Sequence, residues 1–200
     1  IYSASAKDFE SISGAPIAYW LSPAFRRNFE ALPAIKDVFK PAVGLNTGNN
    51  DRFLRQWFEV AFKGIYFSCD SVESAKELPH KWFPYNKGGP YRKWYGNQSF
   101  VLNWENDGFE LKEFATERNA GKHWSRYIQN LDCMFKECIT WSDITTNSFA
   151  ARYSPKGFLF DVKGSSGTPN SNGRIDVTLS LLCSKLMPAF MKCVDRKSVV

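Results

Sequence analysis

The chain has 200 residues, of which 44% are hydrophobic and 23% are charged, and this is the composition of a globular chain rather than a disordered or collagen-like one. Twenty-six Lys and Arg against 20 Asp and Glu give a net charge of +6, which favours a polyanionic partner without requiring one. The longest uncharged stretch, residues 11–25, is interrupted by Gly14, Pro16 and Pro23, so the sequence predicts neither a membrane span nor a signal peptide.

Helix and strand signals alternate in the first half of the chain. Ser22 and Pro23 predict a helix start, because they are followed by Phe25, Phe29 and Leu32 at helical spacing. The pattern then predicts a strand at residues 43–45, a polar loop at 46–51, a helix capped by Asp51 with Phe53 and Trp57 on one face, a strand at 65–67 and a short helix at 71–78.

The second half of the chain has mixed signals as well. We expect a strand at residues 100–104, a turn at Asn106, Asp107 and Gly108, and a mostly helical stretch at 110–135 that is interrupted near Gly121. Residues 139–141 and 158–162 are predicted to be partners in one sheet, and 164–173 to be a loop. Asp176 is predicted to cap a last helix that carries Leu179, Leu182, Leu186 and Phe190, with a kink if the helix continues through Pro188. The predicted class is α+β, mixed helices and short strands.

Several common catalytic and cofactor motifs are missing. No Gly-x-Gly occurs, and the Gly121-Lys122 pair is followed by His123 where a P-loop has Ser or Thr. The chain also has no Gly-x-Ser-x-Gly and no His-Glu-x-x-His. We therefore predict no catalytic and no cofactor-binding residues in this chain.

The cysteines and histidines argue against a metal site. Of five cysteines only Cys133 and Cys138 lie close together, and His80 and His123 are isolated. These spacings match no zinc finger or ribbon. We expect no metal ligands, reduced thiols and a cytoplasmic location.

The most informative segment is residues 81–97, where cations alternate with aromatic residues and no acidic residue occurs. Its cations could neutralise phosphates, its glycines could admit a sugar-phosphate backbone, its rings could stack on bases and its asparagines could read adenine edges. The alternative is a hairpin with core rings and solvated cations. The candidate DNA-binding residues are Lys81, Trp82, Tyr85, Asn86, Lys87, Gly88, Gly89, Tyr91, Arg92, Lys93, Trp94 and Asn97.

A second candidate is the polar loop that leads into a helix at residues 46–55. Backbone N–H groups at a helix start can hold a phosphate, and two arginines follow the loop. The alternative is an Asx-rich turn that caps a surface helix. The candidate DNA-binding residues here are Asn46, Asn49, Arg52 and Arg55.

Four long strings carry a resemblance to a known family: GLNTGNNDRFLRQWFEV (44–60), KWFPYNKGGPYRKWYGN (81–97), VLNWENDG (101–108) and ITWSDITTNSFAARYSPKGFLFDVKGSS (139–166). They closely resemble the PglX family, the adenine-specific DNA methyltransferases of BREX phage-resistance systems, which are related to single-chain restriction-modification methyltransferases. The similarity runs from about residue 7 to the helix at 181–191.

The resemblance implies that residues 1–194 are a target-recognition and connector region of a larger enzyme, downstream of its catalytic domain. Its implied partners are double-stranded DNA, the missing methyltransferase domain and other phage-defence proteins, with no membrane. The parent would use S-adenosylmethionine, but the family's Asn-Pro-Pro-Tyr motif and glycine-rich cofactor loop are absent here. Residues 195–200 match what a common sequencing adaptor encodes in one reading frame, so we expect them to be non-native.

Two other classes of function stay open. Asp161 and Lys163 end a predicted strand and resemble half of a metal-dependent nuclease core, for which Asp143 would have to supply a second carboxylate. A protein-docking module with surface tryptophans is the third possibility, and salt-insensitive binding to a protein would favour it.

Overall fold

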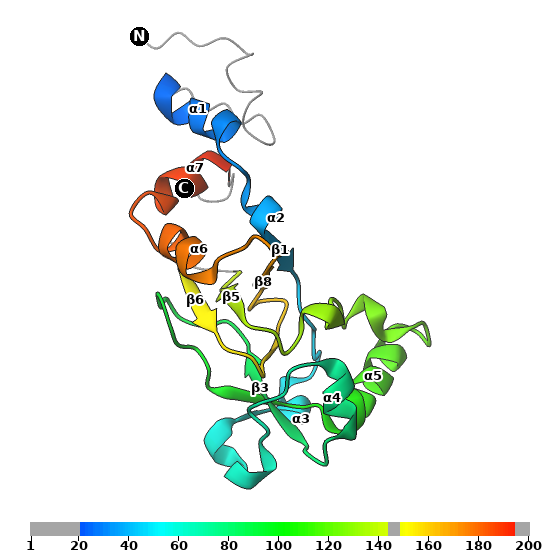
Figure 1. Ribbon diagram of the computed structural model, residues 1–200. Coiled ribbons are helices and arrows are strands. Elements are labelled where there is room, and N and C mark those ends of the chain that lie inside the picture. Colours follow the sequence, from blue (N-terminus) through cyan, green and yellow to red (C-terminus); the bar gives the residue numbers. More distant parts are fainter. Residues whose placement is uncertain (1–20, 144–148, 195–200) are drawn as a thin grey trace.

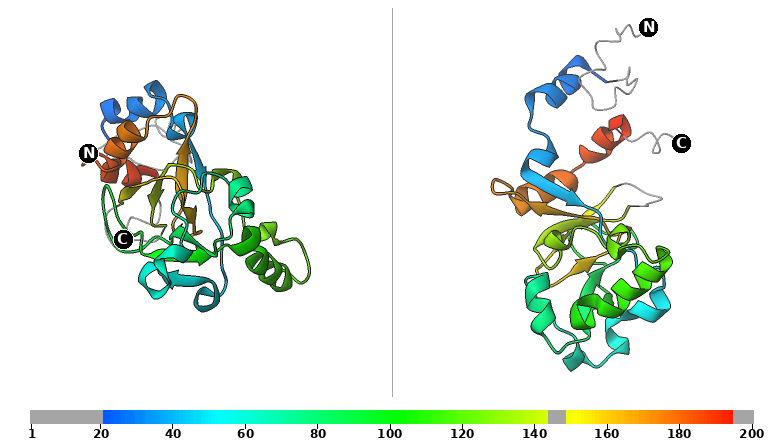
Figure 2. Two further views of the ribbon diagram at one scale, coloured as in Figure 1. Left: turned by 60° about the horizontal axis from the view of Figure 1, so that its bottom comes forward. Right: turned by 90° about the vertical axis from the view of Figure 1, so that its right-hand side faces the viewer.

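The computed structural model describes residues 21–143 and 149–194, without the side chains of 192–194, and the predicted non-native tail at 195–200 lies outside this part of the chain. The fold is mixed, with helices and two small sheets, which confirms the α+β class. Helices α1 (Pro23–Ala31), α6 (Ile175–Leu182) and α7 (Met187–Val194) lie at one end of the molecule, and α4 (Val72–Glu77) and α5 (Glu105–Arg118) lie at the other (Figures 1 and 2).

The first sheet is antiparallel and has the strand order β1-β8-β5-β6. Pro41 is tolerated in β1 because this strand lies at the edge of the sheet and pairs only with β8. Helix α6 covers the sheet, with Leu179 and Leu182 packed in one cluster with Phe39 and Ile139. The strands are β1 (Phe39–Ala42), β5 (Cys138–Trp141), β6 (Ala151–Ser154) and β8 (Ser166–Pro169), and α2 (Ile35–Val38) precedes β1.

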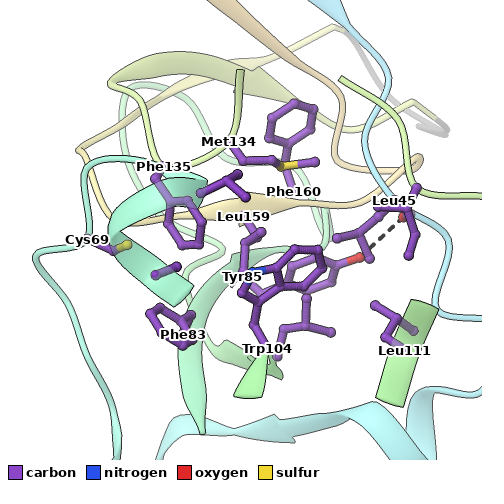
Figure 3. Packing of buried hydrophobic residues seen from close by; sticks show 14 of the residues in the cluster. Leu45, Cys69, Phe83, Tyr85, Trp104, Leu111, Met134, Phe135, Leu159 and Phe160 are labelled. Atoms are coloured by element: carbon purple, nitrogen blue, oxygen red, sulfur yellow. Dashed lines mark hydrogen bonds between the residues drawn. The ribbon is translucent and has the colours of Figure 1, made fainter. Parts of the chain in front are cut away.

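The second sheet has the order β2-β4-β3-β7, and β7 runs parallel to β3 while the other pairs are antiparallel. The larger hydrophobic core surrounds this sheet, where Phe83, Tyr85, Trp104 and Phe135 are fully buried (Figure 3). Its strands are β2 (Leu54–Gln56), β3 (Trp82–Asn86), β4 (Phe100–Asn103) and β7 (Leu159–Phe160).

The helix start predicted at Ser22 and the short helix predicted at 71–78 are confirmed, and in each case a serine hydroxyl precedes the helix. The Ser22 hydroxyl accepts a hydrogen bond from the N–H of Phe25 at 3.2 Å and begins α1. The Ser71 hydroxyl accepts from the N–H of Ser74 at 3.1 Å and begins α4. Each cap satisfies a backbone donor that the helix itself cannot pair. The strand predicted at 100–104 is also present, as β4.

Three predictions in the first half of the chain are wrong. The strand predicted at 43–45 lies earlier, as β1, and Leu45 makes only a single bridge to Asp161. The predicted helix after Asp51 is the short α3 (Asn50–Phe53), capped by Asn49, because the chain leaves it at once to form β2. Phe53 is therefore buried, whereas Trp57 begins a separate 3-10 turn, η2 (Trp57–Glu59). At 65–67 only Ile65 forms a bridge, to Trp82.

The second half also differs from the prediction. Asn106, Asp107 and Gly108 do turn the chain, all with positive φ, but α5 ends at Arg118 and only the 3-10 turns η4 (Trp124–Arg126) and η5 (Leu131–Cys133) follow before residue 135. The strands at 139–141 and 158–162 belong to different sheets, and the predicted loop at 164–173 contains β8. The last helix is two helices, and Arg174 rather than Asp176 precedes the first of them.

The described cysteines Cys69, Cys133, Cys138 and Cys183 are buried free thiols. Burial raises the pKa of the Cys138 thiol to about 11. None of the helices in the described part of the chain is both long and apolar enough to cross a bilayer.

Candidate nucleic-acid interface

The basic and aromatic segment at 81–97 divides into a buried strand and an exposed loop. Strand β3 belongs to the second sheet, and its residues Phe83, Tyr85 and Asn86 are buried, each at most 2% exposed. The side chains of Tyr85 and Asn86, which the sequence suggested as DNA contacts, therefore belong to the interior, and Trp82 is half-buried. The remaining residues, 87–97, form a surface loop that we call the Trp94 loop.

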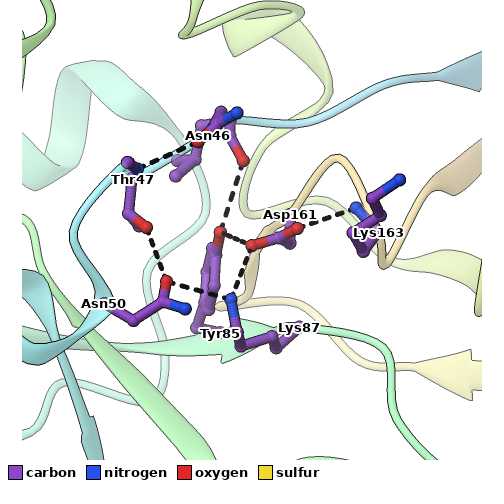
Figure 4. Close-up of polar contacts among 9 residues, drawn as sticks. Asn46, Thr47, Asn50, Tyr85, Lys87, Asp161 and Lys163 are labelled. Carbon is purple, nitrogen blue, oxygen red and sulfur yellow. Dashed lines mark hydrogen bonds and ion pairs between the residues drawn. The ribbon is translucent and has the colours of Figure 1, made fainter.

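A polar network centred on the buried side chains of Tyr85 and Asp161 lies at the base of the Trp94 loop (Figure 4). The Tyr85 hydroxyl donates to the Asp161 carboxylate at 2.7 Å, and the Lys87 ammonium lies 3.2 Å from the same oxygen. Lys87 also donates to the side-chain oxygen of Asn50 at 3.0 Å. Burial, and then the adjacent Asp161 carboxylate, raise the pKa of Tyr85 well above its usual range.

Asp161 and the residue after it bond the turn that follows β7 to two distant segments of the chain. Its other carboxylate oxygen accepts from the backbone N–H of Lys163 at 2.7 Å, and its own N–H donates to the carbonyl of Asn86 at 2.9 Å. The next residue, Val162, donates to the carbonyl of Leu45 at 3.1 Å. Because Asp161 is only 3% exposed and both of its carboxylate oxygens are engaged, it acts as a structural anchor.

The nuclease hypothesis gains no support from this geometry. The Asp143 carboxylate pairs with the Lys163 ammonium at 3.4 Å, and Asp161 is held by Tyr85 and Lys87. In residues 21–143 and 149–194 there is no group of three or more His, Cys, Asp or Glu side chains that could hold a metal ion.

The glycines and Asn97 of the Trp94 loop serve its own conformation. Gly88 has φ 84°, and a Cβ there would lie 2.6 Å from the carbonyl oxygen of Lys163. Residues 161–164, which follow β7, form a turn that we call the Asp161 turn. A side chain at Gly88 would therefore separate the Trp94 loop from the Asp161 turn. The Asn97 amide donates to the carbonyl of Pro90 at 2.9 Å, and Gly89 packs beside it. The sequence predicted that these residues contact the DNA backbone or a base, whereas in the structure they stabilise the conformation of the Trp94 loop.

The aromatic side chains of the Trp94 loop do face solvent. Tyr91, Trp94 and Tyr95 are 46%, 51% and 60% exposed. In Figure 1 the loop is the green segment that runs from β3 toward β6. Backbone hydrogen bonds fix it there: the Trp94 N–H donates to the carbonyl of Ala151 at 3.0 Å, and the Tyr153 N–H donates to the carbonyl of Trp94 at 2.8 Å.

Most cations of the segment already have partners. Lys81 lies 3.7 Å from the Glu105 carboxylate, Lys87 pairs with Asp161, and the Lys93 ammonium donates to the carbonyl of Cys183 at 2.9 Å. Arg92 is exposed and makes no ion pair or side-chain hydrogen bond with another described residue. The free positive charge of the loop is therefore smaller than its composition suggests.

The second candidate region uses its polar groups internally. Asn46 accepts from the N–H of Gly48 at 2.9 Å, and Asn49 accepts from the N–H of Arg52 at 3.0 Å. Arg52 pairs with Glu110 at 2.8 Å, and Arg55 donates to the carbonyls of Asp51 and Leu54, both at 2.6 Å. Helix α3 has only four residues, so the structure favours the Asx-turn alternative over an anion site.

Sequence reasoning missed one exposed surface. Trp57, Phe58, Phe62 and Phe67 are 47%, 62%, 68% and 42% exposed, and we call them the Phe62 patch. The rings form two contacting pairs, Trp57 with Phe58 at 5.8 Å and Phe62 with Phe67 at 5.2 Å. The available signal was a run of aromatic residues that follows neither helical nor strand spacing.

Comparison with known proteins supports the resemblance seen in the sequence. The chain is 39% identical over 199 residues, 98% of its length, to the adenine-specific methyltransferase PglX of Lacticaseibacillus casei (strain Zhang). It is 39% identical over 177 residues, 88% of its length, to the adenine-specific methyltransferase BrxX of Escherichia coli O9:H4 (strain HS). The chain spans only 16% and 13% of these relatives. No family model matches it. The expected resemblance to the PglX family is therefore confirmed.

Proposed function

We propose that this chain is part of an adenine-specific DNA methyltransferase and that its role there is to bind duplex DNA and contribute to recognition of the target. The observation that carries the proposal is the 39% identity over 98% of the chain to a methyltransferase of that specificity. The methyl donor, S-adenosylmethionine, would bind to the rest of the enzyme. The 200 residues here contain no Pro-Pro and no Gly-x-Gly, so they do not fit that cofactor.

The Trp94 loop is the surface that we assign to DNA. It presents three exposed rings and Arg92, a cation that has no ion pair with another described residue, and the stretch 81–97 contains no carboxylate that would repel phosphates. The net charge of +6 favours the same partner. Because only Arg92 is free among the cations of this segment that the structure describes, we expect weak binding by the chain alone.

The test is fluorescence anisotropy with a labelled duplex at increasing salt. Binding that neutralises phosphates should weaken steeply between about 50 and 200 mM salt, because counterions are released. Titration calorimetry with S-adenosylmethionine should show no heat of binding. Affinity for DNA that does not change with salt, or micromolar binding of the cofactor, would contradict the proposal.

The Phe62 patch supports a second candidate function, docking to protein. Four large exposed rings in 11 positions are more apolar surface than a solvated segment needs. We propose the rest of the methyltransferase as the occupant, because more than four fifths of each relative lies outside the matched region. The Phe58→Ser and Phe62→Ser double variant should then lose binding to the L. casei enzyme from which the matched segment has been deleted, while its DNA affinity is unchanged. Self-association of the wild-type chain, abolished by the same variant, would instead make the patch a contact between copies.

A further inference from the structure

Trp94 has a backbone conformation that its residue type disfavours. Its φ is 73°, in the left-handed region where a bulky side chain is rare. The N–H of Tyr95 donates to the carbonyl of Lys93 at 2.9 Å, which closes a three-residue turn around Trp94. Turns of this kind with positive φ are uncommon and strained. A strained residue persists only where the surrounding structure holds it.

Three hydrogen bonds hold Trp94 and its neighbour Lys93 in place. Its N–H and its carbonyl both bond to the backbone of β6, at Ala151 and Tyr153, on the open edge of the first sheet. The preceding residue, Lys93, is fixed by the hydrogen bond from its ammonium to the carbonyl of Cys183. Burial does not offset the strain, because 51% of the Trp94 side chain stays exposed. The fold therefore presents this ring to solvent on a backbone that these hydrogen bonds hold in place.

The neighbouring groups indicate which ligand the ring suits. Tyr91 and Tyr95 add two exposed aromatic surfaces, and Arg92 adds an unpaired cation among the described residues. The amide groups that would read base edges are not available, since Asn86 is buried and the Asn97 amide is bound to Pro90. The loop can therefore stack on a flat ring beside a phosphate, but it offers little to the edge of a paired base.

We infer that Trp94 stacks on an unpaired base of the bound DNA while Arg92 contacts an adjacent phosphate. The inference rests on the proposed function, because it assigns the part of the DNA that the Trp94 loop contacts. Inside a regular duplex each base shows only its edge to a groove, and its face is covered by its neighbours. A nucleotide that has left the stack exposes that face, and stacking on it does not depend on base identity.

The test compares a fully paired duplex with the same duplex carrying one unpaired 2-aminopurine. Wild-type chain should bind the bulged duplex about tenfold more tightly than the paired one and should quench the 2-aminopurine emission. Trp94→Ala should lose this preference and the quenching, so that it binds the two duplexes with equal affinity. Trp57→Ala, which removes a ring of similar exposure from the Phe62 patch, should behave as wild type.

A Trp94→Gly variant separates stacking from folding. Glycine accepts positive φ, so this variant should melt at or above the wild-type temperature while losing the preference for the bulge. The inference would be overturned, with the proposed function still standing, if the wild-type chain bound both duplexes equally. The same holds if Trp94→Ala lowered the affinity for both duplexes by the same factor. Absence of binding to either duplex would overturn the proposed function itself.

Discussion

The hydroxyl of Tyr85 and the carboxylate of Asp161 are 76 positions apart in the chain and form a buried hydrogen bond of 2.7 Å. Tyr85 lies on β3 and Asp161 follows β7, its parallel partner. The bond therefore fixes the turn after β7 against the strand from which the Trp94 loop departs. Lys87, the first residue of that loop, joins the same carboxylate. The position of the exposed loop thus depends on a contact in the interior.

Tyr85→Phe tests how much this contact stabilises the fold. The variant keeps the ring but leaves a buried carboxylate oxygen with one donor fewer, which should lower the free energy of unfolding by about 1 to 3 kcal/mol. Denaturant unfolding followed by circular dichroism measures the change. Tyr91→Phe, an exposed ring with no side-chain hydrogen bond to the described residues, is the matched control and should show no change. Equal stability of the two variants would mean that the buried bond contributes nothing.

Arg92→Ala tests the electrostatic part of the DNA contact. If Arg92 touches a phosphate, its loss should weaken binding to all duplex sequences alike and reduce the salt slope by about one. Lys63→Ala removes an exposed cation near the Phe62 patch and should leave the slope unchanged. Lys87→Ala should act differently, because its ammonium is bound to Asp161 and Asn50. Its main effect should be on stability, and a loss of DNA affinity without destabilisation would contradict the network.

Cys138 makes stability depend on pH in the alkaline range. Its pKa is raised from 9.0 to about 11 by burial, so the folded state favours the neutral thiol. That contribution is complete below pH 9 and is lost as the pH rises toward 11, because the unfolded thiol ionises first. Between pH 9 and 10 the free energy of unfolding should fall by about 1 kcal/mol. Cys138→Ser should remove this part of the slope, and an unchanged slope would show that other groups cause it.

The sequence was sufficient to predict a helix where a single capping residue determines its start. Ser22 and Ser71 cap helices through hydroxyls that lie three residues from their donors, and both helices were predicted. The strands were harder, since β7 has two residues and β8 lies in a segment rich in Gly and Ser that looks like a loop. Such short strands form because a strand distant in the sequence pairs with them. The local residue pattern does not show which distant segment that partner is.

The same limit applies to the candidate site. Composition singled out residues 81–97 as unusual, and in the structure part of that segment is an exposed aromatic loop. The sequence did not show that Tyr85 and Asn86 point into the core, or that Lys87 pairs with a residue 74 positions away. A cation counts toward a DNA surface only if no carboxylate of the fold neutralises it. Tertiary contacts, rather than residue types, therefore decide which members of the segment remain available.

Gly88 and Gly121 form a matched pair that tests the close approach of the Trp94 loop to the Asp161 turn. Both have positive φ, 84° and 77°, so alanine at either position should cost about 1 kcal/mol in backbone strain. A Cβ at Gly121 would meet nothing within 4 Å, whereas at Gly88 it would lie 2.6 Å from the backbone oxygen of Lys163. That oxygen cannot rotate away, so Gly88→Ala should cost about 1 to 3 kcal/mol more than Gly121→Ala in denaturant unfolding. It should also weaken DNA binding by displacing the loop, while Gly121→Ala leaves binding intact. Equal destabilisation by the two substitutions would show that the Trp94 loop and the Asp161 turn can move apart without cost, and the close approach at Gly88 would then contribute nothing to the position of the loop.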